Sequence, residues 1–205
     1  MRRPVLFLIS APSGGGKTTV CNALLAANPG LSRVITCTTR PPRPGEVNGV
    51  DYHFYTQEEF DRRVSAGEFL EHASVYERRY GTRKASVLDL FHEGKDVLLN
   101  IDVQGASSVR GVAAREAELA AALVTVFLTP PTRAELERRL RGRGSDSNEV
   151  IARRMAEAQV EVARWHEFDY LVVSGTQAQD AARMQAILDA ERIRSVRSEL
   201  VWKES

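Results

Sequence analysis

A short segment near the amino terminus has the residue types and spacing needed to hold a nucleotide phosphate. Residues 11–18 read A-P-S-G-G-G-K-T and follow the pattern G-x-x-x-x-G-K-[ST], except that Ala11 replaces the first glycine. The glycines allow backbone N–H groups to converge on an anion, Lys17 adds a positive charge, and the Thr18 hydroxyl can reach Mg²⁺. Ser13 either adds a hydroxyl donor or is a plain turn residue. The residues expected to contact ATP or GTP here are Ala11, Pro12, Ser13, Gly14, Gly15, Gly16, Lys17, Thr18 and Thr19.

The residues around this loop have the pattern of a parallel α/β fold. Residues 5–9 form an all-apolar run, typical of a strand covered on both faces, and a helix pattern at 18–27 follows the loop. A helix that begins there directs the positive end of its dipole toward a bound phosphate. Further strands are expected at 97–101, 124–128 and 170–173, and helices at 132–141, 149–164 and 177 to about 197. This alternation predicts a parallel sheet with helices on both faces.

Residues 36–84 interrupt the alternation. The segment 33–39 is rich in β-branched residues and predicts a strand, and the run P-P-R-P-G at 41–45 must leave regular structure. Aromatic residues gather from residue 49 onward, and a helix is expected at 57–66 with Thr56 as its amino-terminal cap. We therefore predict an inserted lobe of mixed α and β structure.

The composition limits the classes of function. The 205 residues carry a net charge of +1, which argues against a protein that mainly grips nucleic acid. Cys21 and Cys37 have no metal or redox spacing, so both are expected to be small buried residues, and the four histidines share no ligand spacing. The apolar run after Arg2 and Arg3 is too short for a signal peptide or a membrane span. We expect a cytoplasmic protein with no membrane or nucleic-acid partner.

A phosphate loop alone does not separate kinases, GTPases and motor ATPases. The N-K-x-D motif with which GTPases read guanine is absent. A motor ATPase is usually longer and has an acidic run after its second core strand, whereas here the strand at 97–101 is followed by the single acid Asp102. A kinase remains the better interpretation.

The inserted lobe contains side chains that could bind a phosphorylated acceptor. Arg40 and Arg43 lie three residues apart on the proline-rich segment, and two guanidinium groups suit a dianionic phosphate, unless both are simply solvated. Glu71 lies among aromatic residues together with Tyr80 and Thr82. A carboxylate can accept two parallel hydrogen bonds from N1–H and the 2-amino group of guanine. Adenine has neither donor, so this arrangement favours guanine.

The sequence closely resembles the guanylate kinase family, the nucleoside monophosphate kinases that convert ATP and GMP to ADP and GDP. The resemblance extends from residue 10 to about residue 194, and alanine at position 11 is similar to bacterial members. It rests on A-P-S-G-G-G-K-T, T-T-R-P-P-R-P-G-E-V-N-G-V-D-Y, G-E-F-L-E-H-A, Y-G-T, I-D-V-Q-G and R-L-R-G-R-G. It implies a P-loop core at 1–35, 85–141 and 158–205, a GMP-binding lobe at 36–84 and a short lid at 142–157.

The resemblance also implies a role for individual residues. Guanine would be read by Thr36, Glu71 and Thr82, and Asp102 would lie between the two nucleotides, close to GMP and to the water shell of Mg²⁺. The adenine of ATP would lie against Arg139, unless that arginine only belongs to a basic helix face. The GMP phosphate would be held by Arg40, Arg43, Tyr52 and Tyr80, and the transferred phosphoryl group would be contacted by Lys17 and by the lid residues Arg143 and Arg154.

Two positions depart from the family pattern. Asn100 stands where the family often has aspartate, which removes a charge near the metal, and Ser174 stands where an asparagine usually hydrogen-bonds adenine. Two other functions compete with an ATP:GMP phosphotransferase: a silent scaffold domain of similar fold, and a kinase for another small phosphorylated acceptor. Scaffold domains typically lose Lys17 and the lid arginines, which are present here. GMP (with dGMP) and ATP are the expected substrates, and the chain is expected to be a monomer or a small homo-oligomer.

Overall fold

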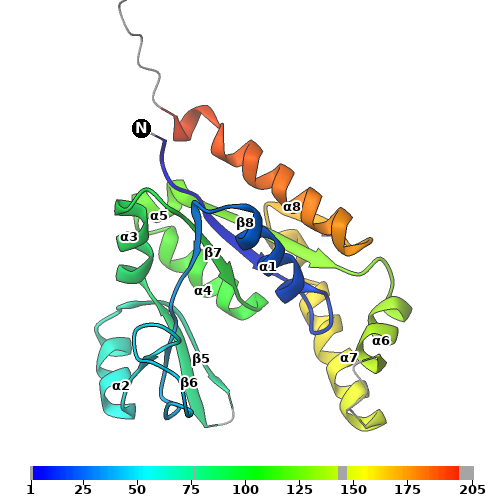
Figure 1. Cartoon of the computed structure of the whole chain (residues 1–205). Coiled ribbons are helices and arrows are strands. Elements are labelled where there is room, and N and C mark those ends of the chain that lie inside the picture. Colours follow the sequence, from blue (N-terminus) through cyan, green and yellow to red (C-terminus); the bar gives the residue numbers. More distant parts are fainter. Residues whose placement is uncertain (1, 76, 143–146, 199–205) are drawn as a thin grey trace, which may run out of the picture.

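A five-stranded parallel sheet forms the centre of the molecule (Figure 1). The computed structural model describes residues 2–75, 77–142 and 147–198. The strand order is β2 (Leu31–Arg33), β7 (Asp96–Asn100), β1 (Leu6–Ser10), β8 (Leu123–Thr129) and β9 (Tyr170–Val173), and each neighbouring pair is parallel. Because the strands are parallel, their carboxyl ends lie along one edge, where ligands of such sheets usually bind.

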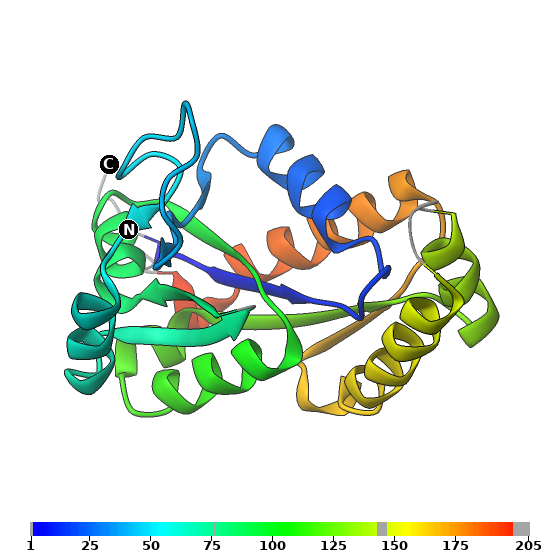
Figure 2. The same cartoon turned by 90° about the horizontal axis from the view of Figure 1, so that it is seen from below.

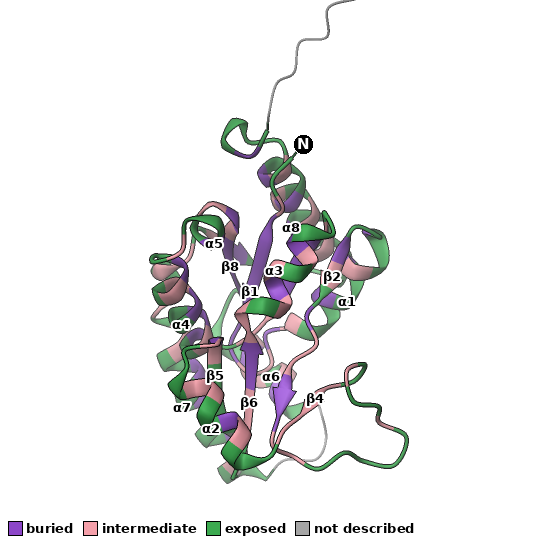
Figure 3. Ribbon diagram, turned by 90° about the vertical axis from the view of Figure 1, so that its left-hand side faces the viewer, coloured by how far each residue is buried: buried purple, intermediate pink, exposed green. Residues whose placement is uncertain are grey.

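Helices cover both faces of this sheet, as the sequence predicts (Figure 2). Side chains alternate along β1, so Phe7 and Ile9 pack on one face with α1 (Lys17–Ala27) and α8 (Gln177–Arg192). Leu6 and Leu8 pack on the other face with α3 (Lys84–His92), α4 (Val103–Ala113) and α5 (Ala117–Ala122). All residues of β1 are buried, and Figure 3 shows the buried centre of the sheet.

A second, four-stranded sheet lies in the inserted lobe. Its order is β4 (His53–Phe54), β3 (Cys37–Thr38), β6 (Arg78–Arg83) and β5 (Phe69–Val75), and α2 (Gln57–Ser65) packs on it through Phe60. Thr56 caps α2 by accepting a hydrogen bond from the backbone N–H of Glu59, which confirms the predicted cap. Cys37 and Phe69 complete this small core.

The helices α6 (Arg133–Arg141) and α7 (Asn148–Val162) pack against each other. Their contact is a separate apolar cluster that includes Leu136, Leu140, Ile151 and Met155. Two short 3₁₀ helices, Trp165–Glu167 and Ser195–Arg197, follow α7 and α8. In the described ranges, every helix falls short of the length or the apolar character that a membrane crossing needs.

Two features differ from the sequence prediction. The single strand expected at 33–39 is wrong: β2 ends at Arg33 in the main sheet, and β3 begins at Cys37 in the second sheet. The chain therefore passes from one sheet to the other within three residues. The helices α3, α4 and α5 were not predicted, because α4, for example, contains Gly105 and Gly111 and has a low intrinsic helix propensity.

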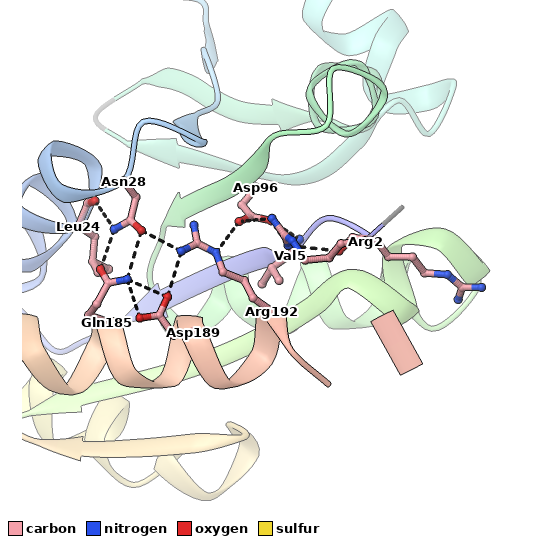
Figure 4. Close-up of polar contacts among 9 residues, drawn as sticks. Arg2, Val5, Leu24, Asn28, Asp96, Gln185, Asp189 and Arg192 are labelled. Carbon is pink, nitrogen blue, oxygen red and sulfur yellow. Dashed lines mark hydrogen bonds and ion pairs between the residues drawn. The ribbon is translucent and has the colours of Figure 1, made fainter. Parts of the chain in front are cut away.

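Asp96, at the start of β7, is a buried carboxylate at the centre of a hydrogen-bond network (Figure 4). Its carboxylate accepts two hydrogen bonds from Arg2, one from the backbone N–H of Val5 and one from Arg192 of α8, at 2.8–3.0 Å. Burial alone would raise the pKa of Asp96, but these donors lower it below its ordinary value. Arg192 also donates to Asn28 at the end of α1. The network joins the amino terminus, α1, β7 and α8 at the edge opposite the phosphate loop.

Candidate active site

The phosphate loop connects the carboxyl end of β1 to the amino terminus of α1. Gly14 and Gly16 have φ values of 87° and 95°, a left-handed conformation that favours glycine, and Gly16 is the amino-terminal cap of α1. A Cβ at Gly14 would also lie 2.9 Å from a side-chain carbon of Leu140. Ala11, in the place of the first glycine, is buried without strain beside this loop. The pattern therefore has the strand–loop–helix context that phosphate binding requires.

A pocket of about 320 Å³ lies against the loop. It is lined by residues 11–19 together with Asp102 and Glu161. Lys17 donates a hydrogen bond from Nζ to the carbonyl oxygen of Ile101 at 2.8 Å. Burial lowers the pKa of Lys17, while the charges of Asp102 and Glu161 act in the opposite direction. The structure thus brings the predicted ATP-contacting residues of the loop into one polar pocket, with its lysine positioned by the main chain after β7.

Glu161 of α7 is a pocket residue that sequence reasoning missed. Its carboxylate accepts a hydrogen bond from the backbone N–H of Ser13 at 3.3 Å. Burial raises the pKa of Glu161, and the Ser13 N–H and Lys17 partly offset that effect. The available signal was its spacing of seven residues from Arg154, which places the two side chains on the same side of α7. Arg154 itself is half-buried.

A second pocket, of about 370 Å³, shares Thr18 with the first. Thr36, Tyr52 and Thr82 of the inserted lobe line it together with the end of β7, including Asn100. Other lining residues that the sequence did not single out are Arg33 and Asp51. The two pockets therefore meet at Thr18, in the first turn of α1, at the carboxyl edge of the main sheet.

Glu71 and Thr82 form a directly opposed pair on β5 and β6. The Thr82 hydroxyl donates to Glu71 Oε1 at 2.6 Å, and Thr82 is fully buried. Burial raises the pKa of Glu71, and the hydrogen bonds from Thr82 partly counteract the rise. The pair brings together two of the three predicted guanine-reading residues, with Thr36 in the same pocket as Thr82.

Arg40, Tyr52 and Tyr80 also lie together. The Arg40 guanidinium lies 5.5 Å from the ring centroid of Tyr52, and the rings of Tyr52 and Tyr80 meet edge to face at 6.3 Å. Arg40 Nη2 donates to both carboxylate oxygens of Glu46, at 2.8 and 2.9 Å, and the Glu46 carboxylate also accepts from the backbone N–H of Arg43. Arg43 is exposed beside this cluster. Glu46 was also missed by sequence reasoning.

Asp102 lines the pocket beside the phosphate loop. It caps α4 by accepting a hydrogen bond from the backbone N–H of Gly105 at 2.7 Å. Its negative charge partly offsets the effect of burial on the pKa of Lys17 and adds to the effect of burial on the pKa of Glu71. Asp102 therefore interacts electrostatically with both the phosphate loop and the inserted lobe.

Arg139 of α6 lies beside the phosphate loop. Its Nε donates to Glu135 at 2.8 Å and its Nη1 donates to Ser174 Oγ at 3.1 Å, which joins α6 to the end of β9. A Cβ on Gly16 would lie 3.8 Å from Arg139 Nη1, so the guanidinium is next to the loop. Arg143, the other predicted lid arginine, lies outside the described residues.

Comparison with known proteins agrees with this arrangement. The family model described as guanylate kinase matches residues 1–191. The guanylate kinase of Paramagnetospirillum magneticum is 47% identical over 96% of this chain and 89% of its own length, and that of Alkalilimnicola ehrlichii is 46% identical over 98% and 95%. The crystal structure of guanylate kinase from Anaplasma phagocytophilum has a TM-score of 0.71 at 31% identity, covering 96% and 90% of the two chains. A match over nearly the whole chain, on a fold that places a phosphate loop beside a second pocket, means that the chain belongs to the guanylate kinase family.

Proposed function

We propose that the two pockets that share Thr18 are where this guanylate kinase transfers the γ-phosphoryl group of ATP to GMP, giving ADP and GDP. The observation that carries the proposal is the contact between these pockets at the first turn of α1. A donor phosphate on the loop and an acceptor phosphate in the second pocket would then face each other, and direct transfer requires that in-line arrangement.

In this proposal the loop holds the ATP phosphates. The loop residues and the first turn of α1 line the pocket, and Lys17 contributes a positive charge there. Arg139, beside Gly16, would contact the adenine end of the nucleotide. Arg154 of α7, with Arg143, would approach the phosphoryl group that is transferred, where positive charge stabilises the transition state.

The inserted lobe would hold GMP. Glu71, fixed by Thr82, would accept hydrogen bonds from the guanine, and the Thr36 hydroxyl would add a third contact. The phosphate would lie against Arg40, Arg43, Tyr52 and Tyr80. The nucleophile is an oxygen of that phosphate, which is already anionic at neutral pH, so the reaction needs no general base. The protein contributes position, positive charge and exclusion of water.

The residues present fit a Mg²⁺ ion that is bound mainly through substrate. Within the described ranges no group of three or more His, Cys, Asp or Glu side chains could enclose a metal ion. Mg²⁺ usually binds one or two protein oxygens plus phosphates and water, and Thr18 and Asp102 lie in the same pocket. When bound, Mg²⁺ would neutralise phosphate charge. Asn100, in the neighbouring pocket, offers a neutral oxygen in place of a carboxylate.

A substrate panel tests the proposed site. Release of ADP would be measured by a coupled assay with ATP as donor and GMP, dGMP, AMP, CMP, UMP or dTMP as acceptor. We expect turnover with GMP and dGMP and little with the other four. Comparable rates with AMP would contradict the assignment of Glu71 and Thr82 as guanine-reading residues.

A further inference from the structure

A buried hydrogen-bonded chain reaches Arg139 from α8. Asp180 and Ser174 are both 4% exposed. The Asp180 carboxylate accepts one hydrogen bond from the Ser174 hydroxyl at 2.6 Å and another from the backbone N–H of Gly175 at 2.8 Å. Ser174 Oγ in turn accepts from Arg139 Nη1 at 3.1 Å. The order Asp180–Ser174–Arg139 therefore connects the first turn of α8, the end of β9 and α6.

The direction of these hydrogen bonds means that Asp180 orients the Ser174 hydroxyl toward which Arg139 donates. A serine hydroxyl has a single proton, and here the proton is used by Asp180. The oxygen must then present a lone pair to Arg139, which has only donors. Without Asp180 the hydroxyl could rotate and point its proton toward the guanidinium. Glu135 holds the Nε side of Arg139, so Ser174 fixes the second point that defines the plane of the group.

Capping of α8 does not account for Asp180. The amino terminus of α8 already has a capping box, in which Thr176 and Gln179 exchange side-chain and backbone hydrogen bonds. Asp180 follows that box, and its side chain turns inward to Ser174 instead of outward to solvent. Burying a carboxylate is unfavourable unless it is hydrogen-bonded. The hydrogen bonds from the Ser174 hydroxyl and the Gly175 N–H therefore stabilise Asp180 in this buried position.

We propose that Asp180 is a positioning residue for the phosphoryl donor: through Ser174 it fixes the Arg139 guanidinium beside the phosphate loop. This inference rests on the proposed function, in which Arg139 contacts the base of ATP. A carboxamide at position 174 could present an acceptor oxygen without help, whereas a serine needs a partner that takes its proton. Asp180 supplies that partner in this chain.

The test is the steady-state kinetics of Asp180→Ala, with ATP and GMP varied separately. Loss of one oriented hydrogen bond to a charged group should raise the KM for ATP about tenfold. The KM for GMP should change less than about twofold, because the hydrogen bonds of Asp180 lead to Arg139 and involve no residue of the inserted lobe. Gln179→Ala is the matched control: it weakens the cap of α8 by removing an adjacent side chain, but it leaves Ser174 and Arg139 paired.

A double variant separates positioning from stability. In Asp180→Ala with Ser174→Asn, the amide oxygen can accept from Arg139 directly, so the KM for ATP should return to within about threefold of the parent value. Ser174→Asn added to Arg139→Ala should give no such recovery, and a recovery there would mean that the introduced asparagine contacts ATP itself and would overturn the inference. Thermal melts of each variant set the assay temperature below unfolding. A merely structural role for Asp180 would lower the melting temperature in both variants without this recovery, and that result would overturn the inference.

The outcomes also distinguish this inference from the proposed function. If the parent protein phosphorylates GMP and Arg139→Ala raises the KM for ATP while Asp180→Ala does not, Asp180 has no positioning role and the proposed site stands. If Arg139→Ala leaves the KM for ATP unchanged, the placement of ATP beside Arg139 is wrong and the inference fails with it. An equal rise of the KM for ATP and GMP in Asp180→Ala would likewise overturn the inference.

Discussion

Replacement of Glu71 by glutamine tests the proposed origin of guanine selectivity. The substitution keeps the size of the side chain but exchanges one acceptor oxygen for an NH₂ donor. Thr82 determines which one, because its hydroxyl donates to Glu71 Oε1 at 2.6 Å. The amide oxygen of Glu71→Gln should remain on Thr82, so its NH₂ group should point toward the bound base. There it would meet a guanine donor, N1–H or the 2-amino group, instead of accepting from it.

The magnitude follows from the hydrogen bonds exchanged. A hydrogen bond to a charged group contributes about 1.5–3 kcal/mol, and the variant loses at least one such bond and sets a donor against a donor in its place. A loss of about 3 kcal/mol corresponds to a decrease of about a hundredfold in kcat/KM for GMP. Adenine presents an acceptor at N1, so kcat/KM for AMP should rise or stay constant.

The assay compares kcat/KM for GMP and AMP at saturating ATP. Glu58→Gln, an exposed acid-to-amide change on α2 of the same lobe, is the control and should leave both values unchanged. Adding Thr82→Ala to Glu71→Gln frees the amide to rotate and should recover part of the GMP activity. Equal proportional losses for GMP and AMP in Glu71→Gln would refute the reasoning, because they would indicate damage to the lobe and not to base recognition.

The raised pKa of Glu71 adds a pH dependence. Only the ionised carboxylate accepts both guanine hydrogen bonds, so kcat/KM for GMP should fall as the pH falls through that pKa. Because burial raises the pKa, the fall should begin at a higher pH than for an exposed glutamate. This acidic limb should be absent in Glu71→Gln. A limb of the same shape in the variant would assign it to another group.

Three further predictions concern the loop, the metal and the fold. Lys17→Ala should lower kcat by a factor of about 100 or more with an unchanged circular dichroism spectrum, and retained turnover would contradict the assignment of the loop. Chelation by EDTA should abolish turnover and added Mg²⁺ should restore it; turnover that persists in EDTA would exclude a metal requirement. Asp96→Asn should lower the free energy of unfolding in urea at pH 7 by about 3 kcal/mol, since it leaves Arg2 and Arg192 without their carboxylate. Because the pKa of Asp96 is lowered in the fold, its contribution is present above the unfolded pKa and is lost as the pH falls through the folded pKa, so the difference between Asp96→Asn and the parent should shrink in acid. A constant difference would disprove that origin.

The parts of the fold that the sequence predicts are those with strong local patterns. The apolar runs at β1 and β8 are buried on both faces, and Thr56 caps α2 as predicted. These features depend on neighbouring residues only. The strand β9 lies at the edge of the sheet, where only Val172 is buried and Leu171 and Val173 are exposed. The helix α4 has a capping residue, Asp102, but Gly105 and Gly111 lower its helix propensity, and its stability comes from packing of Val103, Ala106 and Val109 on the main sheet.

The sequence mainly identified those residues of the candidate site that belong to motifs. Lys17, Glu71 and Arg40 belong to motifs with fixed spacing. The carboxylate of Glu161 does not: it reaches Ser13 across 148 positions of the chain. Glu46 is six residues from Arg40, but its contact with the guanidinium depends on the turn at Pro44 and Gly45. Pairs of this kind are set by tertiary structure, and the sequence alone gives no distance between them.

These carboxylates resolve an apparent conflict between the net charge of +1 and a site for two polyanions. In the structure Arg40 is paired with Glu46 and Arg139 with Glu135, while Lys17 lies near Asp102 and Glu161. Arg40, Arg139 and Lys17 therefore already have carboxylates close to them before any nucleotide binds. In the proposed site, phosphate binding would exchange one anionic partner of these cations for another, and the carboxylates would limit repulsion between the cations in the absence of ligand. Positive charge can thus be concentrated where phosphoryl transfer needs it without a basic surface, which is why overall charge is a poor guide to the substrate of this enzyme.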